Sequence, residues 1–220
     1  MISLQNIHQE FVVGSGKHTA LKDVSLKISE AEIAVLMGPS GSGKSTLLNI
    51  IGGLLTPTSG MVKLNEQELA LLNDNELSRM RNRLVGFVFQ NFNLLPVLTA
   101  FKNIEYPLLL LGIPSNKRKQ MVNDILHKVG LGDMGDRIPS QMSGGQQQRI
   151  AIGRALVTKP KVIICDEPTA NLDSETARDI LELMLNLNDQ LRATLIFSTH
   201  DPRIACIATS LYTLCDGYIK

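Results

Sequence analysis

A glycine-rich segment near the N-terminus carries the pattern G-x-x-x-x-G-K-[ST], between an apolar run at residues 33–37 and a helical segment at 46–51. Glycines let the backbone curl so that successive N–H groups point at an anion, and the following helix adds the positive end of its dipole. Lys44 can neutralise the β- and γ-phosphates of a nucleotide, and the Ser45 hydroxyl can ligate Mg²⁺. A plain turn is the alternative, but the strand and helix signals on its two sides favour a nucleotide phosphate site. The residues predicted to line it are Gly38, Ser40, Gly41, Ser42, Gly43, Lys44, Ser45 and Thr46.

Two consecutive carboxylates end a second apolar run, at residues 162–165. In the neighbourhood of a phosphate loop, Asp166 can hold Mg²⁺ through water, and Glu167 can polarise the attacking water as a general base. An ordinary acidic turn after a strand is the alternative. With Lys44 upstream, the pair favours a metal-side residue and a base.

A serine and two glycines begin a third segment, Ser143-Gly144-Gly145-Gln146. Ser143 and Gln146 have the spacing of a capping box at the start of a helix. The two glycines are poor helix formers, and they leave backbone N–H groups open at the positive end of that helix. Such an end suits a γ-phosphate, whereas the simpler interpretation is a helix cap only.

Composition limits the classes of function. The 220 residues suffice for one domain, or one domain with a subdomain, and the net charge of +1 with no dense basic tract gives no sign of nucleic-acid binding. The three cysteines have no metal-ligand spacing, which suits a reducing cytoplasm. We see no signal peptide, and the apolar runs are too short to span a bilayer, so we expect any membrane-spanning part on another chain.

Apolar runs and turn residues predict an α/β chain with a helical middle. Runs without alternation at 161–165 and 194–198 are typical of parallel strands covered on both faces. Helical periodicity at 174–191, and helical segments within about 91–157, predict a helical subdomain inserted into the core. The expected strands are 2–7, 22–28, 32–37, 61–64, 84–89, 161–165, 194–198 and 210–214, and the inserted helices are 99–110, 115–129 and 143–157.

These motifs, in this order and with His200 after the run at 196–199, resemble the ATP-binding cassette of ABC transporters over nearly the whole chain. The segment from Ser143 to Gln146 is the most specific part of the resemblance. It implies a single domain, residues 1–220. The implied fold is an α/β phosphate-loop NTPase (RecA-like) core with a small antiparallel β subdomain and an inserted α-helical subdomain.

The resemblance also implies roles for residues whose own pattern is weak. Gln90, after the strand at 84–89, would reach Mg²⁺ and the attacking water, and His200 would contact the γ-phosphate. Asp173 would lie in a loop that crosses between subunits, although its position also predicts a helix N-cap. Phe11 would stack on adenine, where the family usually has tyrosine, but a phenylalanine in a first hairpin can also belong to the core.

The implied activity is ATP hydrolysis, with ATP and Mg²⁺ bound between two copies of the chain, Lys44 of one copy facing Ser143 of the other. The implied partner is an integral membrane permease on a separate chain, and the implied place is the cytoplasmic face of the cell membrane. Segments such as 93–96 and 103–105 resemble the ATPases of lipoprotein-release and macrolide-efflux systems. A cell-division or envelope-remodelling ATPase is the alternative. Chromosome and ribosome types fit less well, because the chain has neither sustained heptads nor a second cassette.

A candidate docking surface for the partner lies between residues 90 and 106. This stretch is rich in apolar residues that an isolated domain has less reason to display. They are Phe92, Leu94, Leu95, Val97, Leu98 and Phe101. Packing of all of them into the core is the alternative.

Overall fold

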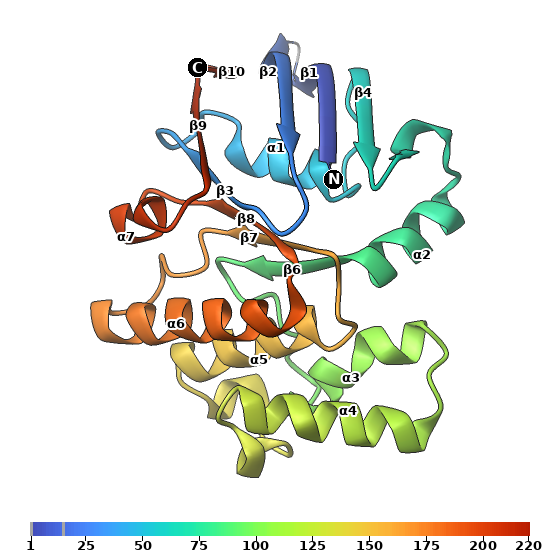
Figure 1. The fold of residues 1–220 in the computed structure, drawn as a ribbon, viewed down its shortest axis with the longest axis vertical. Coiled ribbons are helices and arrows are strands. Elements are labelled where there is room, and N and C mark those ends of the chain that lie inside the picture. Colours follow the sequence, from blue (N-terminus) through green and yellow to red (C-terminus); the bar gives the residue numbers. More distant parts are fainter. Residues whose placement is uncertain (1, 15) are drawn as a thin grey trace. The chain divides into compact units, whose positions relative to one another are not determined.

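The computed structural model describes residues 2–14 and 16–220, and the chain divides into two compact units (Figure 1). The first unit combines residues 1–81 with 194–220, and the second is formed by residues 82–193.

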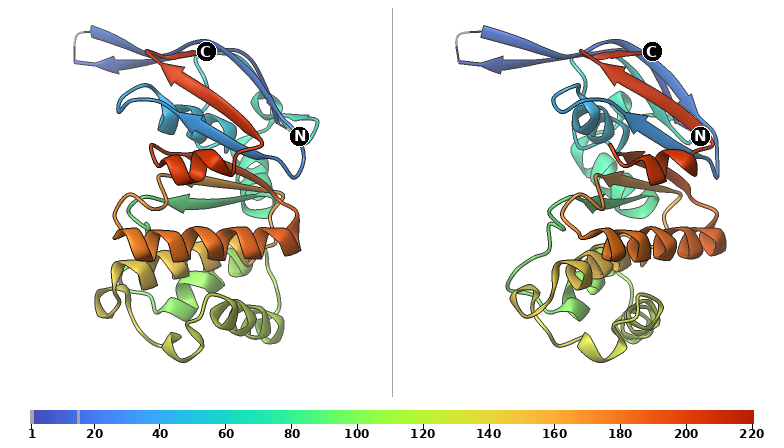
Figure 2. Two further views of the ribbon diagram at one scale, coloured as in Figure 1. Left: turned by 60° about the vertical axis from the view of Figure 1, so that its left-hand side comes forward. Right: turned by 90° about the vertical axis from the view of Figure 1, so that its left-hand side faces the viewer.

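The first unit contains an antiparallel sheet with the strand order β2-β1-β4-β5. Strands β1 (Ile2–Val13) and β2 (Gly16–Ile28) form a hairpin and run side by side in both views of Figure 2. The predicted strands 2–7 and 22–28 are its buried base, and the hairpin continues beyond them. The outer part was missed because its apolar residues, at 11–13 and 20–21, do not alternate with its polar ones. Strands β4 (Ser59–Leu64) and β5 (Gln67–Glu68) complete the sheet.

The same unit contains a parallel group of strands. β3 (Ile33–Met37) lies between β8 (Thr194–Ser198) and β9 (Ser210–Cys215), parallel to both, and β10 (Tyr218–Ile219) pairs antiparallel with β9. The centres of β3 and β8 are fully buried, as the unbroken apolar run at 194–198 predicted for β8. Helix α1 (Lys44–Ile51) follows β3 and contacts strands of both sheets.

The second unit is built on two parallel strands and four helices. β6 (Val85–Phe89) pairs with β7 (Val162–Asp166), and all four helices lie on the same side of this pair (Figures 1 and 2). The helices predicted within this unit are confirmed to within one residue at each end. Their bounds are α3 (Ala100–Leu110), α4 (Ser115–Lys128), α5 (Gly144–Leu156) and α6 (Ser174–Leu191).

Two helices were not predicted. α2 (Asp74–Leu84) carries Leu77, Met80 and Leu84 at helical spacing, and Asn73 and Glu76 cap its start, so a signal is present although only Met80 is buried. α7 (Pro202–Cys206) has five residues, too few for a periodic pattern. Short 3₁₀ turns are at Leu69–Leu71, Gly132–Met134 and Pro139–Gln141. None of the helices in the described part of the chain is long and apolar enough to cross a membrane.

Candidate active site

The phosphate loop joins β3 to α1 in the first unit, and its glycines are required by close packing. Gly43 caps α1 with φ of 105°, and a β-carbon there would lie 2.6 Å from the carbonyl oxygen of Ala20. A β-carbon on Gly38 would collide with the carbonyl oxygen of Leu214. Only glycine combines this backbone conformation with this close approach, so these two positions fix the path of the loop.

The side chain of Lys44 folds back over the phosphate loop. Its Nζ donates hydrogen bonds to the carbonyl oxygens of Gly38 (2.8 Å) and Pro39 (2.9 Å), and the residue is 7% exposed. Ser42 Oγ is also buried in the loop and has no hydrogen-bond partner among the described residues. Ser45 is exposed and Thr46 is half-buried. A buried cation and an unpaired hydroxyl in one glycine-rich turn are the groups that a phosphate can satisfy.

The turn that carries His200 follows β8, next to the end of β3. The amide of Thr199 donates to the carbonyl oxygen of Leu36 at 3.2 Å, and Thr199 Oγ1 accepts from the amide of Asp201 at 2.9 Å. Because β3 and β8 are parallel neighbours, His200 and the phosphate loop follow the same carboxyl edge of this strand pair. The His200 side chain is exposed.

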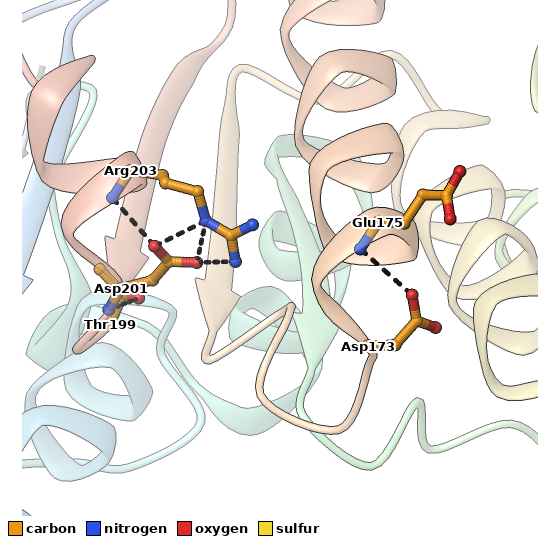
Figure 3. A network of polar contacts seen from close by, with 5 residues as sticks. All are labelled: Asp173, Glu175, Thr199, Asp201 and Arg203. Carbon is orange, nitrogen blue, oxygen red and sulfur yellow. Dashed lines mark hydrogen bonds and ion pairs between the residues drawn. The ribbon is translucent and has the colours of Figure 1, made fainter.

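An ion pair between Asp201 and Arg203 stabilises the turn directly after His200. Figure 3 shows the Arg203 guanidinium against the Asp201 carboxylate, with Nε and Nη2 donating at 3.0 and 2.6 Å. Asp201 also caps α7 by accepting from the amide of Arg203. The hydrogen bond from Arg203 is the main reason that the pKa of Asp201 lies below its usual value.

In the second unit, Gln90 and Glu167 follow neighbouring parallel strands. Phe89 of β6 pairs with Asp166 of β7, so the residue after each lies at the same carboxyl edge. Gln90 is exposed, whereas Asp166 and Glu167 are half-buried. The backbone of Glu167 has φ of 46°, in the left-handed region that costs a non-glycine residue about 1–3 kcal/mol.

The loop after β7 is tied to the loop after β6. Asn171 Nδ2 donates to the carbonyl oxygen of Gln90 at 3.1 Å and to Asn91 Oδ1 at 2.9 Å. Asp173 ends the loop as the N-cap of α6, accepting from the amides of Glu175 and Thr176 (Figure 3 draws the bond to Glu175). The bonds from Thr176 hold the pKa of Asp173 below its usual value. The predicted N-cap is confirmed, and its place in a nucleotide site stays a prediction.

The segment from Ser143 to Gln146 forms the predicted capping box at the start of α5. Ser143 Oγ accepts from the amide of Gln146 at 3.3 Å, and Gln146 Oε1 accepts from the amide of Ser143 at 3.0 Å. Ser143 is exposed, and Gly144 and Gly145 form the first turn of the helix. A β-carbon on Gly145 would lie 2.6 Å from Thr176 Cγ2, so this glycine also lets α5 start close against α6.

Phe11 lies on β1, opposite His18 of β2, and its ring is half-buried. The phenylalanine is therefore not part of the core. Farther along the same hairpin, Ala20 and Leu21 lie against Gly43 of the phosphate loop. The aromatic ring thus belongs to the strand pair that packs on the start of α1.

The buried side-chain amide of Asn103, which the sequence did not indicate as functional, makes hydrogen bonds to the backbone just before and at the start of α3. Asn103 is fully buried, and its Oδ1 accepts from the amide of Leu95 at 2.8 Å. Its Nδ2 donates to the carbonyl oxygens of Leu95, Leu98 and Thr99. A buried asparagine looks like any surface residue in a sequence, so no pattern could have revealed this role.

Comparisons with known proteins agree with the motifs. The sequence model of the family described as ABC transporter matches residues 21–170. The ABC transporter ATP-binding protein YtrE of Bacillus subtilis (strain 168) is 45% identical over 224 residues, which cover 100% of this chain and 97% of that protein. The Macrolide export ATP-binding/permease protein MacB of Syntrophobacter fumaroxidans is 42% identical over 222 residues, which cover 100% of this chain but 31% of that protein.

A solved structure confirms the predicted fold class. The dimeric structure of a post-hydrolysis state of the ATP-binding cassette MJ0796, bound to ADP and Pi, is 40% identical in sequence. It matches with a TM-score of 0.92 over 100% of this chain and 97% of that one. The chain belongs to the ABC transporter family and is an ATP-binding, ATP-hydrolysing cassette of that family.

Proposed function

We propose that this chain is the ATPase subunit of a transport complex, and that it acts as a dimer on a separate integral membrane permease at the cytoplasmic face of the cell membrane. The observation that carries the proposal is the phosphate loop, in which the Lys44 ammonium is held among loop carbonyls beside the unpaired hydroxyl of Ser42. Phosphate oxygens can replace these two carbonyls as partners of the ammonium.

We assign ATP binding to residues of the first unit. Lys44 neutralises the β- and γ-phosphates, and the amides of the glycine-rich turn surround them. His200 donates to the γ-phosphate from the turn braced by the Asp201–Arg203 ion pair. The half-buried ring of Phe11 stacks on adenine.

The residues present fit Mg²⁺, a hard cation that prefers oxygen ligands and usually takes one or two carboxylates together with substrate phosphates. In the first unit Ser45 would offer a hydroxyl, and in the second unit Asp166 would offer a carboxylate and Gln90 an amide oxygen. When bound, the ion neutralises charge that develops on the phosphates. Glu167 accepts the proton of the attacking water at its carboxylate, and the left-handed backbone at this residue helps to fix the direction of that side chain.

We propose that two copies bind ATP head to tail. The support is the exposed start of α5, where Ser143, Gly144 and Gly145 present the positive end of a capped helix. In this arrangement Ser143 contacts the γ-phosphate held by Lys44 of the second copy. Gln146 fixes Ser143 through the capping box, and the loop that ends at Asp173 crosses to the second copy. The related cassette MJ0796 has been solved as a dimer.

We propose a permease partner of the lipoprotein-release or macrolide-efflux type. The relative MacB is named as a combined ATP-binding and permease protein, and this chain covers about a third of it. The closely similar YtrE has nearly the length of this chain.

The stretch from 90 to 106 is the proposed docking surface. Val97 is 84% exposed, and Leu95 and Tyr106 are also exposed, whereas the other apolar residues quoted above are half-buried. The side chain of Asn103 stabilises the backbone of this loop with four hydrogen bonds. A rigid loop that displays apolar side chains suits a protein contact.

Val97→Asp should abolish copurification with the membrane protein while leaving ATPase activity and thermal stability of the isolated subunit unchanged, because the new charge lies on the surface. Leu71→Asp is the matched control, since Leu71 is an apolar side chain with 78% exposure outside this stretch. The measurement is affinity purification of the tagged chain from detergent-solubilised native membranes, with the partner identified by mass spectrometry. Undiminished recovery of the permease with Val97→Asp would contradict the docking surface.

A further inference from the structure

A fully buried glutamine joins helix α5 to the loop that carries the general base. Gln148 lies in the second turn of α5, and its Nε2 donates to the carbonyl oxygen of Pro168 at 2.6 Å. Pro168 directly follows Glu167, whose backbone is in the left-handed region. Gln148 Oε1 is buried and has no partner among the described residues, so the amide is held in place by the single bond that it donates. A buried polar group with one good partner is costly to displace.

An arginine farther along α5 holds the segment after Gln90. Arg154 Nη1 donates to the carbonyl oxygen of Asn93 at 2.6 Å, and Nη2 donates to that of Phe92 at 2.9 Å. Both of these residues have left-handed backbones, with φ of 59° for Phe92 and 47° for Asn93. Two consecutive non-glycine residues in this region require support from their surroundings.

The two hydrogen bonds donated by the Arg154 guanidinium provide that support, but burial of the charged group costs free energy. Burial lowers the pKa of the guanidinium, because the charged form has given up water. The planar guanidinium reaches two successive carbonyls with two different nitrogens, whereas a lysine at this position would have a shorter side chain and a single nitrogen for both. The two loops are also joined to each other, because Asn171 donates to the carbonyl oxygen of Gln90 and to Asn91.

We propose that α5 couples the nucleotide-contacting end at Ser143 to the two catalytic loops of its own subunit, with Gln148 and Arg154 as positioning residues. This inference rests on the proposed head-to-tail dimer. When Ser143 engages the ATP of the second copy, any displacement of α5 reaches the Glu167 loop through Gln148 and the Gln90 loop through Arg154. Each subunit then completes its own hydrolytic geometry in response to the nucleotide of the other, which makes hydrolysis cooperative between the two sites.

The test compares two arginines of the same helix. Arg154→Lys keeps the positive charge but loses the paired guanidinium contacts to the carbonyls of Phe92 and Asn93. Gln148→Leu removes the donor to the carbonyl oxygen of Pro168. Arg149→Lys is the matched control, because Arg149 Nη1 donates to the carbonyl oxygen of Val129, outside both catalytic loops. For Arg154→Lys and Gln148→Leu we expect kcat to fall about ten- to a hundredfold, because small misplacements of reacting groups are costly. The affinity for ATP should stay unchanged, and the Hill coefficient for ATP should fall to one.

Hydrogen exchange of the full chain provides an independent measurement. Arg154→Lys should speed exchange of the amides at 90–98, and Arg149→Lys should leave them at the wild-type rate. If Gln148→Leu does not fold, Gln148→Met replaces it, because methionine is close to glutamine in length, adapts to its surroundings and has no donor. Unchanged kcat and Hill coefficient in Arg154→Lys, or an equal loss in Arg149→Lys, would overturn the proposal.

The proposed dimer is tested separately. A wild-type chain that shows no ATP-dependent association would contradict the head-to-tail dimer and, with it, cooperativity through α5. Loss of cooperativity in the two α5 variants while ATP-dependent association persists supports the coupling. Association together with wild-type cooperativity in these variants refutes the coupling and leaves the dimer standing.

Discussion

Glu167→Gln is expected to slow ATP hydrolysis by about 10²–10⁴-fold, the usual contribution of a general base. The amide has the same shape as the carboxylate but cannot accept the proton of the attacking water. The affinity for ATP should be unchanged, because the phosphate loop of the first unit is untouched. Phosphate release under saturating ATP and titration with a fluorescent nucleotide measure the two quantities.

The matched control for this substitution is Glu175→Gln. Glu175 is an exposed carboxylate in the first turn of α6, eight residues further along the chain, and we assign it no catalytic role. Its replacement should leave turnover at the wild-type rate. Normal turnover in Glu167→Gln, or an equal loss in both variants, would refute the assignment of Glu167 as the base.

Lys44→Ala is expected to weaken ATP binding by about ten- to a hundredfold, because hydrogen bonds to charged groups contribute about 1.5–3 kcal/mol. The variant removes the cation that opposes the β- and γ-phosphates. It also removes the two bonds that hold the carbonyls of Gly38 and Pro39. Isothermal titration with ATP measures the change.

Two comparisons make the Lys44 result interpretable. Lys27→Ala removes an exposed lysine of β2 and should leave ATP affinity unchanged. Thermal unfolding without nucleotide shows how much of the effect comes from loosening the loop itself. An ATP affinity in Lys44→Ala equal to that of the wild type would rule out the phosphate loop as the binding site.

Local patterns in the sequence were sufficient for much of the fold and for the site elements. The phosphate loop and the capping box of Ser143 and Gln146 depend on neighbours within a few residues, so their spacing predicts them. The buried strands and α3 to α6 have clear apolar periods. Helix α2 was missed although Leu77, Met80 and Leu84 have helical spacing, because these three apolar residues stand among eight polar ones.

The residues that hold the site together could not be found in this way. Arg154 contacts a carbonyl sixty-one residues away in the chain, Gln148 one twenty residues away, and Asn171 one eighty-one residues away. Each donates to a backbone oxygen, which any residue type can provide, so the partner leaves no trace in the sequence. Asn103 also contacts backbone groups. Its burial could not be predicted, because asparagine usually lies on the surface.

The most direct test of the central claim, that two copies close around ATP with Lys44 of one facing Ser143 of the other, is static light scattering of the Glu167→Gln protein. We expect the mass of a monomer without nucleotide and twice that mass with Mg²⁺ and ATP. Adding Ser143→Arg should return the ATP-loaded protein to the monomer mass, because a bulky side chain would occupy the place of the γ-phosphate. A mass that depends neither on ATP nor on Ser143→Arg would contradict the account.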